Sequence, residues 1–361
     1  MKILHIHPAM RSGGIESMIC GLANEMSKHE DVTVCSIFQP NQDDIFWNKL
    51  APSVHKTTLG KKEKGFSMKE IFKIYEFLKR ERFDIVNMHG MFYYYAFSVL
   101  LLHNKIKFFY TVHSDAAKEN TSWDAKLLPL KKLFFKVGFI HPITISEISQ
   151  ASFEKLYQCP STLIYNGVPK SQFTNEDLTK KYRLTPETKI FLHAGRIDSS
   201  KNQLVLCRVF NRLIEEGEDV VLLIAGVNQD ENIFQSIRPY FGERIHYLGE
   251  RDDIPLLMSQ CDGMCLPSIW EGMPIVLLEA LSVGCVPICS PVGGIVNVIK
   301  DGYNGFLSSS SNEVDFYATM RNFISLNSDE INRIKRNCLT SFSKYSIENT
   351  AKKYLRSYNS L

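Results

Sequence analysis

The stretch from Pro267 to Gly305 reads PSIWEGMPIVLLEALSVGCVPICSPVGGIVNVIKDGYNG. It contains two glutamates, Glu271 and Glu279, with seven residues between them. A turn at Gly272–Pro274 precedes an apolar segment of helical length, so we expect a helix to begin there. Carboxylates beside a turn of this kind are suited to accept hydrogen bonds from hydroxyl groups.

A glycine pair, Gly293 and Gly294, follows the apolar strand expected at Val286–Ser290 and predicts the start of a second helix. Unpaired backbone N–H groups and the positive end of the helix dipole meet at such junctions and favour anions. The stretch therefore predicts a pocket for a ligand with a diphosphate and several hydroxyl groups, such as a nucleotide sugar.

Length and composition limit the possibilities outside this stretch. A chain of 361 residues exceeds the size at which single cores stop growing, so two domains are expected. A net charge of +3 is too mild to indicate nucleic-acid binding. There is no run of about 18 apolar residues that would predict a membrane span. The N-terminal MKILHIHPAM is predicted to be a first strand and not a signal peptide.

The nine cysteines lie mostly in apolar runs, which is typical of reduced, buried thiols in a cytoplasmic protein. Two C-x3-C pairs occur, Cys261 with Cys265 and Cys285 with Cys289. Their spacing differs from that of zinc ribbons, so we predict core thiols and no metal site.

The first half begins as a doubly wound α/β sheet would. Lys2–His7 is a predicted strand, Arg11–Gly14 a glycine-rich turn, and the apolar residues that follow recur at helical spacing. The turn lacks the full G-x-G-x-x-G pattern, which disfavours a dinucleotide. Gly13 and Gly14 would let another ligand approach the backbone closely, although a tight turn without a ligand is the alternative.

Two histidines, His89 and His113, stand at the carboxyl ends of predicted strands, where α/β sheets bind ligands. We expect a functional role for His113 more than for His89, since a histidine at a strand end often only caps or packs. Further strands and helices are expected at Asp31–Phe38, Lys69–Arg80, His141–Ser146, Glu147–Leu156 and Ser161–Tyr165.

Residues Ser122–Phe139 are expected to form a basic and strongly apolar helix, broken or started at Pro129, with Lys126, Lys131, Lys132 and Lys136. One interpretation is a helix on a membrane surface that reaches a lipid-linked substrate. The other is an ordinary helix that covers the sheet and has solvated lysines.

Acceptors are expected at two loops, Lys61–Ser67 and Met91–Tyr95. Lys61, Lys62 and Lys64 could face a phospholipid or a pyrophosphate-linked glycan, and a solvated loop is the alternative.

The second half repeats the pattern from the strand Lys189–Ala194 onward. Arg196 and Lys201 flank the strand-to-helix turn, where their charges would neutralise a diphosphate. Other strands are expected at Asp219–Gly226, Arg244–Leu248 and Gly263–Leu266, and helices at Glu313–Leu326, Asp329–Phe342 and Ser346–Tyr358. We expect an acceptor-side domain at 1–168, a nucleotide-sugar domain at 169–343 and a helix at 344–361 that packs back on the first domain.

This ordered set of motifs resembles the retaining glycosyltransferases of family four, with their two Rossmann-like domains of the GT-B fold facing across a cleft. The resemblance covers essentially the whole chain. It is carried by Gly13-Gly14, His113-Ser114, Ile145-Ser146-Glu147, Tyr165 to Val168, Gly195-Arg196, Lys201-Asn202, Leu248-Gly249, Pro267-Ser268, Glu271 to Pro274, Glu279-Ala280 and Gly293-Gly294. The family often has Phe-Gly after the first Glu-Gly, where this chain has Met273-Pro274, and this departure bears on which sugar fits.

The resemblance implies a role for each matching residue. Gly14, Arg196 and Lys201 would hold the donor diphosphate, and Glu279 the ribose. His113 and Glu271 would meet the transferred sugar. The remaining positions expected at the donor are Gly13, Leu248, Arg251, Gly272, Met273, Pro274, Ile275, Val276 and Leu277, and those expected more weakly on the acceptor side are His89 and Ser146.

The expected reaction is transfer of a sugar, with retention of configuration, from a nucleotide-diphosphate sugar such as a UDP-sugar. Arg196, Lys201 and helix N-termini would stabilise the leaving diphosphate, so neither a metal nor another cofactor is expected. The absence of an Asp-x-Asp triplet from the sequence agrees with this expectation. Glu271 is expected at the far hydroxyls and not as a covalent nucleophile.

We expect a glycan or polyprenyl-diphosphate-linked acceptor in the synthesis of a bacterial capsule, O-antigen or exopolysaccharide. The expected location is the cytoplasm, with the region Lys126–Lys136 on the inner membrane face. Two alternatives use the same scaffold: a nucleotide-sugar 2-epimerase and a non-catalytic nucleotide-sugar-binding partner. A dehydrogenase is disfavoured, because the glycine pattern is incomplete and no acidic residue ends the second strand.

Overall fold

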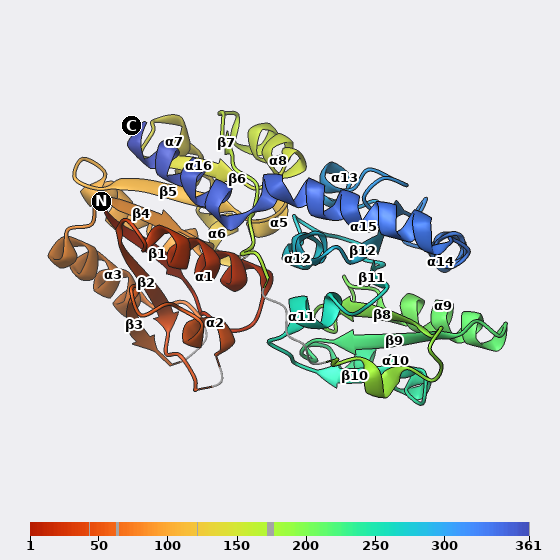
Figure 1. Cartoon of the computed structure of the whole chain (residues 1–361). Coiled ribbons are helices and arrows are strands. Elements are labelled where there is room, and N and C mark those ends of the chain that lie inside the picture. The colour runs from red at the N-terminus through yellow and green to blue at the C-terminus, as the bar shows by residue number, and fades with distance from the viewer. Residues whose placement is uncertain (43, 63–64, 121, 172–176, 361) are drawn as a thin grey trace. The chain divides into compact units, whose positions relative to one another are not determined.

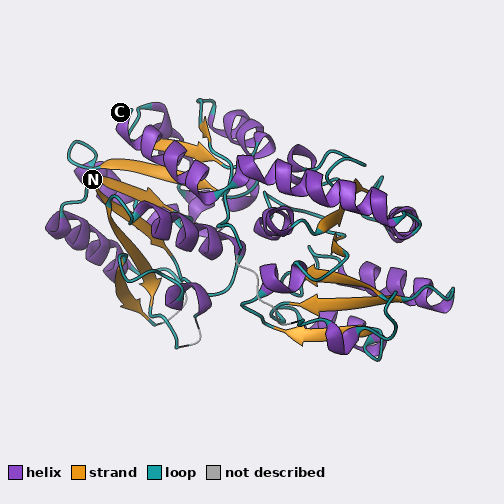
Figure 2. Cartoon of the chain, in the orientation of Figure 1, coloured by secondary structure: helices purple, strands orange, loops and turns teal. Residues whose placement is uncertain are grey.

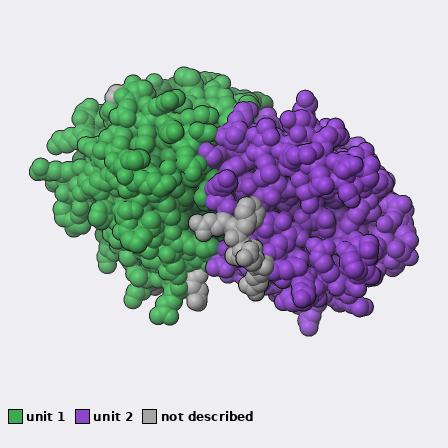
Figure 3. All heavy atoms as spheres, in the orientation of Figure 1, with its two compact units in different colours: residues 1–169, 347–361 green, residues 170–346 purple. Residues whose placement is uncertain are grey.

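A computed structural model describes residues 1–42, 44–62, 65–120, 122–171 and 177–360. The chain divides into two compact units (Figure 3). Unit 1 comprises residues 1–169 and 347–361, and unit 2 comprises residues 170–346. Each unit is built on its own parallel sheet, as Figure 2 shows by colour. The predicted α/β class with two Rossmann-like domains is confirmed.

The sheet of unit 1 has seven parallel strands in the order β3-β2-β1-β4-β5-β6-β7 (Figure 1). The chain runs outward from β1 to β3 and then returns to pair β4 with β1. Ligands of open α/β sheets bind at such a reversal, outside the carboxyl ends of the strands. The strands are β1 (Lys2–His7), β2 (Asp31–Phe38), β3 (His55–Lys61), β4 (Ile85–Met88), β5 (Lys107–Val112), β6 (Ile140–Thr144) and β7 (Thr162–Leu163).

The helices of unit 1 cover the sheet because successive strand residues point to opposite faces. Leu4 and Ile6 of β1, for example, join the main buried cluster with Ile71 and Ile74 of α3. The helices are α1 (Gly14–Met26), α2 (Ile45–Asn48), α3 (Met68–Glu81), α4 (Ala96–Leu102), α5 (Ala116–Glu119), α6 (Ser122–Lys126), α7 (Leu128–Lys136) and α8 (Glu147–Tyr157), with a 3-10 turn η1 at Phe92–Tyr94.

The last helix of the chain, α16 (Ile347–Asn359), belongs to unit 1 and packs against α1. It is joined to the sheet through polar groups, since Asn87 Nδ2 donates to the Tyr358 hydroxyl at 2.9 Å. Thr111 Oγ1 donates to Asn87 Oδ1 at 3.0 Å, which extends this link to β5. The face of the sheet opposite Leu4 and Ile6 is therefore partly polar.

The sheet of unit 2 has six strands in the order β10-β9-β8-β11-β12-β13, so its strand order reverses between β8 and β11. This is the same reversal as in unit 1. Its strands are β8 (Lys189–Ala194), β9 (Val220–Ala225), β10 (Ile245–Gly249), β11 (Gly263–Leu266), β12 (Val286–Cys289) and β13 (Phe306–Leu307).

The helices of unit 2 pack on a sheet whose interior strand β9, next to the edge strand β10, is buried at every position. On one face, Phe191 of β8 contacts Phe210 and Phe323 edge-on. The helices are α9 (Gln203–Glu215), α10 (Glu231–Ile237), α11 (Ile254–Met258), α12 (Ile275–Val283), α13 (Ile295–Val298), α14 (Glu313–Ile324) and α15 (Ser328–Phe342), with 3-10 turns η2 at Lys180–Tyr182, η3 at Arg238–Tyr240 and η4 at Ser343–Tyr345.

Two expectations about lysines, Lys61 and Lys131, need correction. Lys61 ends strand β3 and is only 7% exposed, so it does not belong to a solvated loop. The basic segment is divided into two helices, since Pro129 stands in the first turn of α7, and this agrees with the predicted break or start at Pro129. Lys131 points inward, where its Nζ donates to Asn120 Oδ1 at 3.2 Å and lies 4.2 Å from the centre of the Tyr110 ring.

No helix among the described residues is both long and apolar enough to cross a membrane.

Candidate active site

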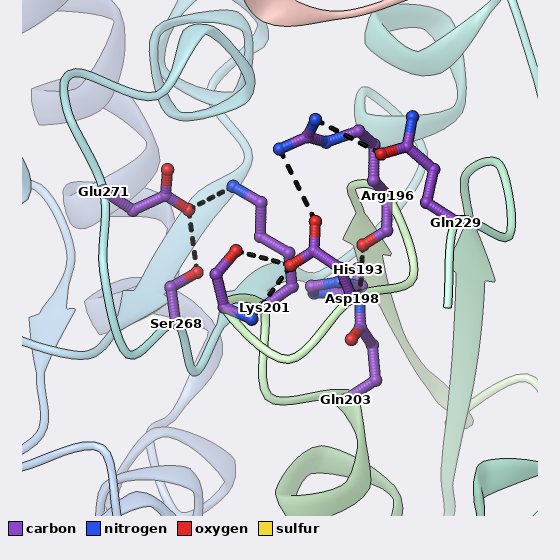
Figure 4. A network of polar contacts seen from close by, with 9 residues as sticks. His193, Arg196, Asp198, Lys201, Gln203, Gln229, Ser268 and Glu271 are labelled. Carbon is purple, nitrogen blue, oxygen red and sulfur yellow. Dashed lines mark hydrogen bonds and ion pairs between the residues drawn. The ribbon is translucent and has the colours of Figure 1, made fainter. Parts of the chain in front are cut away.

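Three side chains of unit 2 meet beyond the carboxyl ends of β8 and β11, at the reversal of the strand order (Figure 4). Lys201 Nζ lies 2.6 Å from Glu271 Oε1, and Ser268 Oγ donates to the same oxygen at 2.8 Å. The side chains of Lys201 and Glu271 are 16% and 7% exposed, and Ser268 is fully buried. An ion pair with so little solvent around it is held in one geometry by its hydrogen bonds.

The loop that carries Lys201 is fixed from several sides. Asn202, at the N-cap of α9, has φ +58° and donates through Nδ2 to the carbonyls of Pro267 and Ser311 at 3.1 and 2.9 Å. The Ile269 N–H donates to the Ser200 carbonyl at 2.8 Å. These bonds tie the turn after β8 to the turn after β11, which brings Lys201 to Glu271.

Arg196 lies at the start of this loop and remains half exposed. One guanidinium nitrogen lies 3.5 Å from Asp198 Oδ2, and another donates to Gln229 Oε1 at 3.3 Å (Figure 4). Behind it, Gln203 Nε2 donates to the Arg196 carbonyl at 2.7 Å and lies 3.2 Å from His193 Nε2. Burial lowers the pKa of His193 to about 4, so the ring is neutral and supports the loop without adding charge.

The turn from Glu271 to Pro274 leads directly into α12, whose N-cap residue, Pro274, makes no capping hydrogen bond through its side chain. Leu277 N–H donates to the Pro274 carbonyl at 3.2 Å. The donor residues predicted along this segment are Gly272, Met273, Pro274, Ile275, Val276, Leu277 and Glu279. Of these, Gly272, Val276 and Glu279 are partly exposed and the other four are buried.

The glycine pair fits tightly against this turn. Gly293 has φ +54°, and a Cβ there would lie 1.8 Å from the Glu271 carbonyl oxygen. Gly294 N–H donates to the Gly272 carbonyl at 2.5 Å. Only glycine can occupy position 293 without moving the backbone of Glu271. The helix that follows, α13, is a single turn.

Leu248 and Arg251 lie at the end of β10 and just after it. Both are partly exposed, and Arg251 is paired with Asp253 through two guanidinium contacts, of 2.7 Å to Oδ1 and 2.5 Å to Oδ2. The Gly226 N–H donates to the Gly249 carbonyl at 2.8 Å and keeps the ends of β9 and β10 together. Any base-binding role of these residues remains a prediction.

In unit 1, Gly13 and Gly14 lie at the start of α1, beyond β1. Gly13 is extended, with φ 167°, and the Glu16 side chain lies above it, so that a Cβ on Gly13 would come within 2.4 Å of Glu16 Oε2. Glu16 Oε1 lies 3.7 Å from His7 Nε2. A carboxylate therefore stands beside the glycine pair that was predicted to approach a diphosphate, and sequence reasoning did not consider Glu16.

His113 directly follows β5 and is joined to other side chains at two atoms. Its Nε2 lies 2.9 Å from Nδ1 of His89, and its backbone N–H donates to Glu119 Oε1. Burial, together with the nearby His7, lowers the pKa of His113 to about 3. Burial raises the pKa of Glu119 to about 7, against the opposing effect of Lys131. His113 is thus a neutral ring at physiological pH.

Two residues predicted on the acceptor side have other partners. His89 is fully buried, and its two ring nitrogens contact His5 and His113. Ser146 caps α8, since its Oγ accepts from the Ser149 N–H at 3.1 Å. The structure therefore leaves no ring nitrogen of His89 for an acceptor. Lys64, the third lysine of the predicted basic loop, lies outside the described residues.

Sequence reasoning missed three residues that hold these sites. Ser268 and Asn202 appeared only as motif neighbours, although a serine three residues before Glu271 and an asparagine at a helix start are signals for hydrogen bonding. His5 was read only as part of a strand. Its alternation with Leu4 and Ile6 places it on the other face, toward His89.

The site in unit 2 has the groups needed to bind an anion with hydroxyls. Lys201 and Arg196 provide positive charge, Glu271 and Ser268 provide oxygen acceptors, and the start of α12 provides backbone donors. In the described part of the chain, no three His, Cys, Asp or Glu side chains are grouped as a metal ion would require. The C-x3-C cysteines are buried free thiols whose pKa values are raised by burial.

Comparison with known proteins identifies the family. The model described as "Glycosyltransferase Family 4" matches residues 12–172, and the model described as "Glycosyl transferases group 1" matches residues 174–338. Among curated proteins, the chain is 27% identical over 293 residues to the Escherichia coli UDP-Gal:alpha-D-GlcNAc-diphosphoundecaprenol alpha-1,3-galactosyltransferase, covering 75% of this chain and 73% of the relative. It is 23% identical to the Bacillus anthracis N-acetyl-alpha-D-glucosaminyl L-malate synthase, covering 72% of each.

Solved structures agree on the fold. Anabaena HepE in complex with UDP-glucose superimposes with a TM-score of 0.80 at 17% identity over all of both chains. The sucrose-phosphate synthase of Thermosynechococcus elongatus gives a TM-score of 0.80 at 16% identity, covering 99% of this chain and 98% of that one. The predicted resemblance is confirmed: the chain is a glycosyltransferase with the GT-B fold and belongs to glycosyltransferase family 4.

Proposed function

We propose that this enzyme transfers a sugar from a UDP-sugar to a polyprenyl-diphosphate-linked glycan, with retention of configuration and without a metal ion, in a bacterial surface polysaccharide pathway. The observation that carries the proposal is the meeting of Lys201, Glu271 and Ser268 beside the start of α12. The galactosyltransferase of Escherichia coli is named for UDP-Gal and a diphosphoundecaprenol acceptor, which supports this choice of donor and acceptor.

In this proposal each group has a defined task. Lys201, Arg196 and the N–H groups at the start of α12 stabilise the leaving diphosphate as its negative charge grows. Glu271 accepts hydrogen bonds from hydroxyls of the transferred sugar, Glu279 accepts from the ribose, and His113 contacts the sugar. The leaving phosphate oxygen takes the proton of the acceptor hydroxyl on the face of attack, so no carboxylate has to act as a nucleophile.

A donor panel followed by product analysis tests this function. Binding of UDP-, GDP-, TDP- and CMP-sugars is measured by thermal shift, and the best donor is incubated with an undecaprenyl-diphosphate-linked monosaccharide, with and without EDTA. We expect UDP-sugars to raise the Tm most, and NMR of the product to show an α-anomer from an α-linked donor, unchanged by EDTA. A β-product would contradict retention, and loss of turnover with EDTA would contradict metal independence. Epimer formed from donor alone would identify a 2-epimerase.

Exposed apolar and basic side chains on α4 and α7 support a second part of the proposal, contact with a membrane surface. Leu100 and Leu101 of α4 and Leu133 of α7 are about half exposed, as is Val137 after α7. The ends of α4 and α7 lie together, because the rings of His103 and Phe139 stack with centroids 3.7 Å apart. Lys132 and Lys136 flank this apolar surface, whereas the buried Lys131 takes no part.

Vesicle binding tests this surface. At low salt we expect stronger partition onto anionic than onto neutral vesicles, with a loss of about 1 kcal/mol for each of Lys132→Gln and Lys136→Gln. Lys335→Gln, on α15, is the control. Equal partition onto both kinds of vesicle would contradict the proposal.

The two loops expected to meet an acceptor are in contact. The Phe66 ring stacks on Trp123, with centroids 4.4 Å apart, and lies 6.0 Å from Tyr93. The Tyr94 hydroxyl donates to the Gly65 carbonyl at 2.9 Å. Phe66 and Trp123 remain over a third exposed, so aromatic faces are available at these loops. We assign the acceptor to this region, and predict that Phe66→Ala raises the KM for the acceptor but not for the donor.

A further inference from the structure

Three histidines of unit 1 lie in a row across neighbouring strands at the reversal of the strand order. His5 lies in β1, His89 directly follows β4, and His113 directly follows β5. The strands pair as β1 with β4 and β4 with β5. We call His5, His89 and His113 the histidine row.

The rings of the row contact one another through nitrogen atoms. His5 Nδ1 lies 3.2 Å from His89 Nε2, and His89 Nδ1 lies 2.9 Å from His113 Nε2. The rings of His5 and His89 are stacked, with centroids 5.5 Å apart. His5 and His89 are fully buried, so water does not compete for these bonds. Nδ1 of His113 is the one nitrogen at the outer end that the row does not use.

A contact between two imidazole nitrogens requires a proton on one and a lone pair on the other. The protonation of the three neutral rings is therefore coupled, and only two arrangements satisfy both contacts. In the outward arrangement, His5 donates to His89, His89 donates to His113, and all three protons are on Nδ1. In the inward arrangement the donors are reversed, and all three protons are on Nε2.

The surroundings of His5 distinguish these arrangements. His5 Nε2 is buried and has no hydrogen-bond partner among the described residues. The inward arrangement would place an N–H at this atom with nothing to accept it, and buried N–H groups without acceptors are rare. In the outward arrangement, His5 Nε2 carries only a lone pair. This arrangement also leaves a proton on Nδ1 of His113.

We propose that His5 and His89 are positioning residues that hold the ring proton of His113 on Nδ1, so that His113 presents a neutral hydrogen-bond donor to a hydroxyl oxygen of the transferred sugar. This inference rests on the proposed function, in which His113 contacts that sugar. A neutral donor is suited to a hydroxyl, whereas a charged imidazolium would also attract the diphosphate.

The charged and titratable groups around the row are compatible with neutral rings. Burial lowers the pKa of His5 to about 4. His7 of β1 donates through Nδ1 to the His89 carbonyl at 3.0 Å and lies 3.7 Å from Glu16 of α1. Glu119 of α5 accepts from the backbone N–H of His113 and not from its ring. In the contacts that the structure describes, no carboxylate accepts from a ring nitrogen of the row.

NMR of the full chain labelled with 15N-histidine tests the tautomers directly. The chain has ten histidines, and the signals of the row are assigned by their loss in His5→Asn, His89→Asn and His113→Asn. We expect the three rings of the row to have the proton on Nδ1 and to remain neutral down to about pH 5. A proton on Nε2 of His113 would overturn the proposal.

A matched pair of variants tests the consequence for catalysis. Asn at position 5 can place an amide donor near the position of Nδ1, whereas Phe keeps ring size and removes the donor. We expect His5→Phe to lower kcat/KM by about tenfold or more and to shift the proton of His113 away from Nδ1, and His5→Asn to restore both. His29→Asn, at an exposed position, is the control.

Two readouts separate the possible outcomes. If His5→Phe lowers the Tm and kcat/KM but leaves the His113 tautomer unchanged, His5 is structural and the proposal is wrong. If no sugar transfer is found with any donor but the tautomers are as expected, the proposed function fails while the assignment of the row stands. Equal kcat/KM for His5→Phe and the wild type would also overturn the catalytic role.

Discussion

The two sheets reverse their strand order at equivalent places, between β1 and β4 in unit 1 and between β8 and β11 in unit 2. The side chains at the two reversals nevertheless differ in charge. The reversal in unit 2 holds an ion pair, Lys201 with Glu271. The reversal in unit 1 holds buried imidazoles, such as His5 and His89, that burial keeps uncharged.

This difference shows how one topology provides two environments. In unit 2 the turns after β8 and β11 bring charged side chains to the edge, where we propose that they bind a diphosphate. In unit 1 the corresponding positions carry rings that sit behind the edge on the buried face of the sheet. The charged edge is suited to stabilise a leaving group, and the neutral one is suited to orient a hydroxyl.

The largest expected effect comes from removing the charge in unit 2. We predict that Lys201→Met lowers kcat by about 10²–10³-fold, because the growing charge of the diphosphate loses a partner. It should also destabilise the protein by about 3 kcal/mol, since Glu271 is left buried with only Ser268. Steady-state kinetics and denaturant unfolding provide the measurements.

The double variant Lys201→Met/Glu271→Gln separates these effects. Stability should return while activity does not, because the unpaired buried charge is gone but the cation is still missing. Arg212→Gln, which breaks an exposed pair with Glu216, is the control and should leave the free energy of unfolding without a measurable change. Wild-type kcat in Lys201→Met would remove Lys201 from the proposed mechanism.

The next prediction compares glycines near the two reversals. Gly293 in unit 2 and Gly90 in unit 1 both have positive φ, of +54° and +77°. A Cβ at Gly293 would strike the Glu271 carbonyl, whereas a Cβ at Gly90 would meet nothing within 4 Å. Gly293→Ala should therefore lower the free energy of unfolding by about 3 kcal/mol or more, and Gly90→Ala should lower it by only about 1 kcal/mol. Equal losses of Tm would show that the crowding at Gly293 relaxes freely.

Much of this framework could be predicted from apolar patterns. Lys2–His7, Asp31–Phe38, Lys189–Ala194 and Gly263–Leu266 are strands over the predicted ranges, because buried parallel strands are nearly continuous apolar runs bounded by polar turns. Strand β3, HKTTLGK, was missed because an edge strand needs little apolar surface and this one is mostly polar.

The sites were harder to predict, since their contacts join distant residues. Lys201 and Glu271 were each expected near the donor, but nothing in the local sequence indicates that they pair with each other. The basic segment at Lys126–Lys136 suggested four surface lysines, and only the three-dimensional packing shows that Lys131 enters an aromatic pocket. Burial of a lysine depends on rings from other elements, which periodicity does not reveal.

A fall in pH should destabilise unit 1 more than unit 2. The buried histidines of the row have lowered pKa values, so they bind protons on unfolding, and their stabilisation is lost as the pH falls from about 6.5 toward 4. Glu119 has the opposite sign, because its pKa is raised to about 7 and the folded state keeps a proton that the unfolded state releases.

The three histidines of the row take up three protons on unfolding and Glu119 releases one, a net uptake of two protons, or about 2.7 kcal/mol per pH unit between pH 6 and 5. Elsewhere in unit 1, burial lowers the pKa of His141 and raises the pKa of Asp124, so these two groups act in opposite directions. In unit 2, His193 gives about 1.4 kcal/mol per pH unit, and the lowered pKa of His246 acts in the same direction. Hydrogen exchange measured at pH 7 and pH 5 should therefore show protection lost first in β1, β4 and β5. Earlier loss in β8 and β9 would contradict the difference between the units.

The smallest effect concerns the helix that supports the neutral site. The Tyr358 hydroxyl of α16 accepts from Asn87 at 2.9 Å, beside the histidine row, and Tyr358 is fully buried. Tyr358→Phe removes this acceptor and keeps the ring, so it should destabilise unit 1 by about 1 kcal/mol and leave unit 2 unchanged. Tyr303→Phe, on an exposed ring of unit 2, should have no measurable effect. Because Asn87 also accepts from Thr111, a loss well above 1 kcal/mol would mean that the polar groups of this face act as one network. A loss of protection in unit 2 would mean that α16 stabilises more than the sheet it covers.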